Sequence, residues 1–167
     1  MSPTARAAEQ AEQAEQAEQA ETSGYDQRAG MTQPDARTVV TRYLQALRTR
    51  DAQAIPELIA ADAVYRIPGS HPLAGTFRGL DEITEKFFTP MGALFDPEAA
   101  YSVEVSHVLA EGDQVSVECV TRSRTVHGTP YAIDISAQFT VRDGKIVSMR
   151  EYFDTQYFTA TLFGKEA

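Results

Sequence analysis

The sequence of 167 residues contains one cysteine, Cys119, which excludes an internal disulfide framework and any multi-cysteine metal site. Its 15 Lys and Arg residues form no block and the formal net charge is -9, which argues against nucleic acid as a partner. No apolar run is long enough to span a membrane, and the N-terminus lacks the apolar region of a secretory signal. We therefore expect a cytoplasmic protein with no membrane or nucleic-acid partner and with a small or neutral ligand.

Metal and thiol chemistry have little support in the sequence. The three histidines, His71, His107 and His127, are dispersed, with none of the spacings that bring metal ligands together. No suitably spaced basic group activates Cys119, which is expected to be a small buried residue. We expect neither a metal nor another cofactor.

The first 30 residues differ in composition from the rest. Residues 8–19 are four copies of Ala-Glu-Gln, and residues 1–30 contain no Leu, Ile, Val or Phe. A period of three matches no helical face and leaves nothing to bury. We predict a disordered tail over 1–30 and a single α+β domain over 31–167.

Helical spacing of apolar residues appears in three stretches of this domain. The first runs from a cap at Thr32 to about Thr49, and the second follows Asp51. The third begins at Leu80 and is interrupted at Pro90. Each has one apolar face that must be buried.

Alternation with a period of two indicates strands over 63–67 and again from Tyr101 onward. In the first strand after Tyr101, alternation places His107 on the apolar face together with Val103, Val105 and Leu109. Strands that are apolar on one side need a cover, which only the helices can supply. We predict an α+β roll, in which three N-terminal helices pack on a strongly curved, mostly antiparallel sheet.

The last hairpin, residues 137–154, contains the most informative anomaly. It turns at Asp143-Gly144, the pair that favours a tight β-turn. Val147, Met149, Glu151 and Phe153 alternate onto one face, so one carboxylate interrupts an apolar row. Burial would raise the pKa of Glu151 toward that of a usable general base. At the mouth of a pocket, or paired with an Arg side chain, Glu151 would instead be an ordinary solvated carboxylate.

The order and spacing of several motifs resemble the nuclear transport factor 2-like superfamily, in its SnoaL-like polyketide cyclase and ketosteroid isomerase branch. The motifs are Asp51-Ala-Gln-Ala-Ile, Pro68-Gly-Ser-His-Pro-Leu-Ala-Gly, Arg142-Asp-Gly-Lys-Ile-Val and Tyr152-Phe-Asp. The resemblance covers about residues 32–158. It implies a cone-shaped roll with a pocket at its open end, and a homodimer formed through the outer sheet face.

Steroid isomerases of this branch use a tyrosine, an aspartate base and a protonated aspartate. The resemblance places the tyrosine at Tyr43, but Ile67 and Ala137 occupy the two aspartate positions. Ketosteroid isomerase activity is therefore not expected. The same matching puts Tyr65, Met149, Glu151 and Phe153 on the pocket side.

These observations assign candidate roles. Glu151 is the expected base and Tyr43 the expected donor to an enolate oxygen, with His71 or His107 as an auxiliary acid. Each has an ordinary alternative, since Tyr43 could be a core aromatic, His71 a surface-loop residue and His107 a packed histidine. The expected substrate pocket comprises Tyr65, Ile67, Phe87, Cys119, Ala137, Phe139, Met149 and Phe153.

We expect a cofactor-independent cyclase or isomerase that acts by acid-base chemistry on a hydrophobic, carbonyl-containing small molecule. Polyketide-like or steroid-like ligands would suit it. The first alternative is a non-catalytic binding or dimerisation module. The second is an epoxide hydrolase-like enzyme, which the inward faces support less because they lack an Asp-Arg-Asp arrangement.

Overall fold

The computed structural model describes residues 34–164, so the predicted disorder of 1–30 lies outside the described residues. Helix α2 (Ala36–Thr49) begins after Asp35, whose carboxylate accepts a hydrogen bond of 2.7 Å from the Thr38 N–H. The predicted cap at Thr32 is therefore replaced by Asp35, three residues later. The buried face of α2 carries Ala36, Val39, Val40, Tyr43, Leu44 and Ala46.

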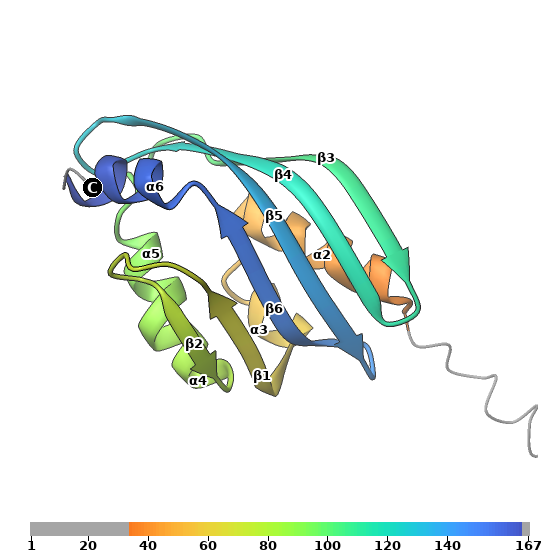
Figure 1. Ribbon diagram of the computed structural model, residues 1–167. Coiled ribbons are helices and arrows are strands. Elements are labelled where there is room, and N and C mark those ends of the chain that lie inside the picture. Colours follow the sequence, from red (N-terminus) through yellow and green to blue (C-terminus); the bar gives the residue numbers. More distant parts are fainter. Residues whose placement is uncertain (1–33, 165–167) are drawn as a thin grey trace, which may run out of the picture. The chain divides into compact units, whose positions relative to one another are not determined.

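Six strands form one sheet in the order β2-β1-β6-β5-β4-β3, and all neighbours are antiparallel except β1 and β6. The strands are β1 (Ile59–Ile67), β2 (Gly75–Arg78), β3 (Ser102–Glu111), β4 (Gln114–Arg124), β5 (Pro130–Arg142) and β6 (Lys145–Phe153). Figure 1 shows the long strands β3 to β6 curving across α2, which contacts all four of them. The predicted α+β roll with a curved, mostly antiparallel sheet is confirmed.

The other helices are short. They are α3 (Ala54–Leu58), α4 (Leu80–Ile83), the π-helical η2 (Thr84–Phe88), α5 (Thr89–Gly92) and α6 (Thr155–Phe163). Strand β2 and helix α6 were not among the predicted elements. No helix within residues 34–164 is long and apolar enough to cross a membrane.

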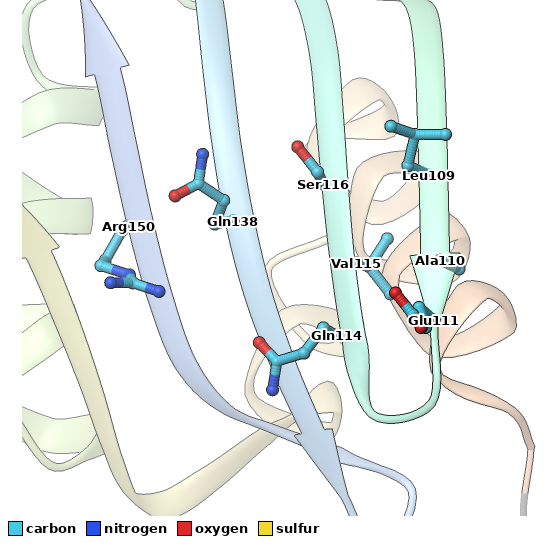
Figure 2. A pocket seen from close by; sticks show the side chains of 8 residues that line it. All are labelled: Leu109, Ala110, Glu111, Gln114, Val115, Ser116, Gln138 and Arg150. Carbon is cyan, nitrogen blue, oxygen red and sulfur yellow. The ribbon is translucent and has the colours of Figure 1, made fainter.

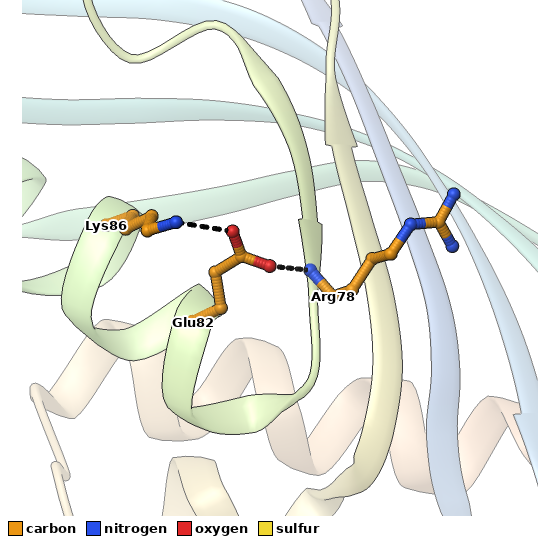
Figure 3. Close-up of polar contacts among 3 residues, drawn as sticks. All are labelled: Arg78, Glu82 and Lys86. Carbon is orange, nitrogen blue, oxygen red and sulfur yellow. Dashed lines mark hydrogen bonds and ion pairs between the residues drawn. The ribbon is translucent and has the colours of Figure 1, made fainter.

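Glu82 fixes the start of the α4–η2 segment to β2. Gly79 precedes α4 without a side-chain cap, and Glu82 instead uses both carboxylate oxygens (Figure 3). One accepts from the Arg78 N–H at 2.7 Å and the other pairs with Lys86 at 2.7 Å. This holds η2 in place, and π-helical turns of this kind are frequent at functional sites.

The β5–β6 hairpin turns at Asp143-Gly144 as predicted, with positive φ at both residues. Its register pairs Ala137 with Glu151, and Phe139 with Met149. A register irregularity after Thr140 places Ile146 in the core and leaves Val147 partly exposed. The prediction that Val147 shares the inward face is therefore wrong.

A second bulge, between Val105 and His107, reverses the alternation of β3. His107 lies opposite Glu118, and both side chains are exposed. Beyond the bulge, Leu109 is 61% exposed, and Val108, opposite the buried Val117, turns partly inward in its place. The prediction that His107 belongs to an apolar inward face is corrected, because one extra residue moves the following side chains to the other face.

Candidate functional site

Glu151 lies on the inward face of β6, as its alternation predicted, between Ala137 of β5 and the end of β1. Protein atoms surround the carboxylate, yet the residue keeps partial solvent exposure, so it occupies a recessed position. Burial raises its pKa to about 6, although a hydrogen bond with the Tyr65 phenol opposes the rise. Glu151 is thus largely ionised at pH 7 but desolvated, as a general base requires.

Several phenols gather around this carboxylate. Burial and then the charge of Glu151 raise the pKa of Tyr43 and of Tyr65, and burial followed by the same charge raises the pKa of Tyr101 to about 12. All three phenols therefore keep their protons at neutral pH, which leaves each O–H able to donate a hydrogen bond. Tyr43 lies in α2, Tyr65 in β1 and Tyr101 immediately before β3, so three segments that are far apart in the chain come together near Glu151. These three tyrosines and Glu151 form the phenol cluster.

An apolar recess of about 490 Å³ adjoins this cluster. It lies between the end of α2, α3, the η2–α5 segment and the start of β3. Tyr101 lines the recess, and the charge of Glu151 helps to raise its pKa. Phe88 also lines the recess, and the centroid of its ring lies 6.0 Å from that of the Tyr65 ring. The recess is lined by Leu47, Arg50, Ala52, Ile55, Pro56, Thr84, Phe88, Thr89, Met91, Gly92, Phe95, Pro97 and Tyr101.

The residues predicted to form the substrate pocket do not line this recess. Tyr65, Ile67, Phe87, Cys119, Ala137, Phe139 and Met149 are buried in the core, and Phe153 is partly buried against it. Tyr43 is equally buried, and its ring packs edge-on against Phe139 at 5.7 Å. The residues that line the recess were missed because they come from helix ends and turns, where no periodic pattern marks an inward side.

His71 is buried rather than exposed in its loop. Its ring stacks against Phe158 at 4.6 Å and Phe153 at 5.7 Å, and only 6% of the residue is exposed. Within residues 34–164 neither ring nitrogen has a hydrogen-bond partner. The ring lies near the protein surface, and burial lowers its pKa, while the nearby Pro68 carbonyl only partly offsets this. Gly69, at φ 124°, allows the close approach, because a Cβ there would lie 3.0 Å from His71 Cδ2.

Replacing His71 by leucine is expected to raise the free energy of unfolding by about 1 kcal/mol at pH 7.5, because an unpartnered buried polar ring is removed. Burial lowers the pKa of His71 in the folded protein, so the unfolded chain takes up the proton first and the wild-type protein loses stability as the pH falls below about 6.5. Leucine does not titrate, so the variant should not show this loss. Urea unfolding at pH 7.5 and 5.5 measures both effects, and a less stable variant at pH 7.5 would contradict this interpretation.

The structure does not bring His107 to the cluster, since it lies on the outer face of β3. Cys119 does face inward on β4, where burial raises its pKa to about 11, so the thiol stays protonated. Residues 34–164 contain no group of three His, Cys, Asp or Glu side chains placed to hold a metal ion. The titratable groups of the cluster are therefore Glu151 and the tyrosines around it.

A second recess, of about 480 Å³, lies on the outer face of the sheet. Figure 2 shows Ser116, Gln138 and Arg150 on neighbouring strands, on the side away from α2. Arg150 adjoins Glu151 in the chain and therefore points to the opposite face. This recess is open, and its lining mixes apolar with polar and charged side chains.

Solved structures share this architecture. A nuclear transport factor 2-like protein from Burkholderia thailandensis is 22% identical, with a TM-score of 0.68 over 77% of this chain and 97% of that chain. TerC, co-crystallised with polyporic acid, is 24% identical, with a TM-score of 0.66 over 76% and 97% of the two chains. A Catenulispora acidiphila protein of ketosteroid isomerase-like fold, in complex with trimethylamine, is 22% identical, with a TM-score of 0.62 over 74% and 91%.

At these identities the structures establish the fold alone. The family model described as a SnoaL-like domain matches residues 40–149, from the middle of α2 to β6. That span includes Tyr43, Tyr65 and Tyr101, and it ends two residues before Glu151. The chain therefore belongs to the SnoaL-like domain family, and its fold is nuclear transport factor 2-like.

Proposed function

We propose that this protein is a cofactor-independent cyclase or isomerase that removes a proton next to a carbonyl group of a hydrophobic small molecule. The observation that carries the proposal is Glu151, a recessed carboxylate whose pKa burial raises to about 6. A base of this pKa is ionised at neutral pH and still holds an abstracted proton well enough to return it. A polyketide-like or steroid-like skeleton would suit the apolar recess.

In the proposed reaction the Glu151 carboxylate takes a proton from the carbon next to the carbonyl, and the electron pair moves onto the carbonyl oxygen. A phenol of the cluster donates a hydrogen bond to the resulting enolate oxygen. Tyr43 remains a candidate donor, and Tyr101 is a second, because it lines the recess itself. Protonated Glu151 then returns its proton to another carbon of the enolate; alternatively, the enolate carbon attacks a second carbonyl to close a ring, and the resulting alkoxide takes the proton back from Glu151.

The shape of the site supports a small hydrophobic substrate. Most side chains that line the recess are aliphatic or aromatic, and one of them, Tyr101, has its pKa raised by the charge of Glu151, which does not itself line the recess. Burial of the Glu151 carboxylate removes water from around it and increases its basicity toward a carbon acid. A structural relative co-crystallised with polyporic acid shows that a similar fold is compatible with a small organic ligand.

The test uses 2-tetralone, an apolar aryl ketone with acidic protons beside its carbonyl. In D₂O at pH 7.5 the full chain is expected to accelerate exchange of these protons above the buffer rate, as followed by NMR. Isomerisation of 5-androstene-3,17-dione should not occur, because Ile67 and Ala137 occupy the two carboxylate positions of that chemistry. Exchange at the buffer rate would overturn the proposal.

A non-catalytic binding module is the second candidate, and the complete packing of Tyr43 against Phe139 favours it. Such a module would bind 2-tetralone without accelerating exchange.

In either case we propose a homodimer through the outer sheet face, where Tyr152 is 41% exposed. Size-exclusion chromatography with light scattering distinguishes the dimer from a monomer.

A further inference from the structure

Arg50 occupies a backbone position that favours glycine. It follows the last residue of α2 with φ 52° and ψ 37°, in the left-handed region. Helices commonly end in this conformation at glycine, because a Cβ atom is disfavoured there. A large side chain kept in such a conformation is a reason to look for a function of that side chain.

The Arg50 guanidinium is held in place by uncharged groups. Its Nη1 donates to the Pro97 carbonyl at 2.8 Å and its Nη2 to the Asp96 carbonyl at 3.4 Å. The same group lies over the Tyr101 ring, 5.2 Å from the ring centroid. No carboxylate within residues 34–164 forms an ion pair with Arg50, so these contacts orient its charge without neutralising it.

This oriented charge lines the apolar recess. Arg50 is the only charged residue among the described side chains that line the cavity of about 490 Å³. The nearby carboxylates of Asp51 and Asp96 are engaged in their own turns, where Asp51 accepts two backbone N–H hydrogen bonds and Asp96 accepts one. Although the whole chain carries a net charge of -9, its apolar recess thus presents a single cation.

We propose that the recess selects amphipathic anions: the apolar body of the ligand fills the cavity, and a carboxylate or an enolate oxygen of the ligand binds Arg50. This deepens the proposed function, on which it rests, by naming the substrate class of the same site. Arginine presents five N–H donors, so donors remain after its two carbonyl contacts. The Arg50 guanidinium lies over the Tyr101 ring, and the charge of Glu151 raises the pKa of the same tyrosine, so Tyr101 relates the proposed anion site to the proposed base.

A purely structural role for Arg50 predicts different behaviour. If its side chain only tethers the turn at Asp96 and Pro97, its removal should lower the melting temperature and affect charged and neutral ligands alike. Arg50→Gly separates the two roles, because glycine relieves the left-handed backbone while it removes the cation. Arg48→Gln, an exposed cation on the last turn of α2, is the matched control.

The experiment measures dissociation constants of the full chain for anthraquinone-2-carboxylate and for its neutral carboxamide by isothermal titration calorimetry at pH 7.5. Wild type and Arg48→Gln are expected to bind the carboxylate about tenfold more tightly than the amide, as a charge-assisted hydrogen bond implies. Arg50→Gly should bind both equally, with a melting temperature close to that of wild type. The preference should also weaken as salt is added.

Equal affinity for the two probes in wild type, failure to bind either probe, or a preference that persists in Arg50→Gly would each overturn the inference. The result is independent of turnover, because Glu151→Gln should keep the carboxylate preference while it loses proton exchange. A catalytic protein without anion preference would refute only the assignment of Arg50. An anion-binding protein without exchange would refute only the proposed chemistry.

Discussion

Replacing Glu151 by glutamine is expected to lower the rate of 2-tetralone proton exchange by at least about 100-fold, the usual contribution of a positioned general base. Glutamine keeps nearly the same shape but cannot accept the proton. In wild type the exchange rate should rise with pH through about 6, the pKa to which burial raises this carboxyl. NMR measurement of exchange between pH 5 and 8 checks both results.

The same substitution should stabilise the fold. Burial raises the pKa of the Glu151 carboxyl from 4.5 to about 6. The stability that this carboxyl contributes is therefore fully present below pH 4.5 and is lost as the pH rises through 6, which lowers the free energy of unfolding by about 2 kcal/mol. At pH 7.5 the neutral glutamine removes this penalty, so the melting temperature should rise by about 5 °C. At pH 4 the gain should disappear.

Glu118→Gln is the matched control, because Glu118 is an exposed glutamate on the outer face of β4. It should change neither exchange nor stability at pH 7.5 measurably. Retained exchange in Glu151→Gln would remove the base from the proposed mechanism. A loss of stability at pH 7.5 would show that the carboxylate is favourably paired instead of desolvated.

Truncating Phe139 to alanine is expected to cost about 3–5 kcal/mol of unfolding free energy, the largest stability effect expected at a single site. Phe139 is 2% exposed in the C-terminal part of β5, opposite Val115 of β4 and Met149 of β6. Its ring also supports Tyr43, so the cavity would open beside the phenol cluster. Urea denaturation followed by circular dichroism measures the loss.

Leu109→Ala is the comparison, since Leu109 is 61% exposed on β3 and should cost no more than about 0.5 kcal/mol. Similar losses for the two variants would mean that the register of β3 differs from the one described. A small loss at Phe139 alone would mean that the core around Tyr43 is loosely packed.

The sequence predicted the secondary structure best where one local period extends over a whole element. Helix α2 follows its helical spacing to Thr49, and the β5–β6 hairpin turns at Asp143-Gly144 as that pair indicates. It failed at β2, which has four residues, and at α6, whose apolar residues show little segregation to one face. Short or weakly amphipathic elements form because neighbouring parts of the fold cover them.

Among the predicted site residues, too, the prediction was correct where the local alternation continues and wrong where a bulge interrupts it. Alternation along β6 placed Glu151 on the inward face correctly, because the bulge of that hairpin lies before it. Alternation along β3 failed at His107, because a bulge lies between Val105 and His107. A bulge inserts one residue without leaving a pattern in the sequence, and every later side chain changes face.

The sequence by itself therefore determined the fold class, the inward carboxylate of Glu151 and the family resemblance, which depend on periodicity and on the order of motifs along the chain. Only the tertiary structure decided that the Tyr65 phenol lies beside the Glu151 carboxylate, that His71 is enclosed by Phe153 and Phe158, and that Arg50 lines an apolar recess. These features join segments far apart in the chain, and the energy that creates them comes from packing between elements, which no local pattern encodes.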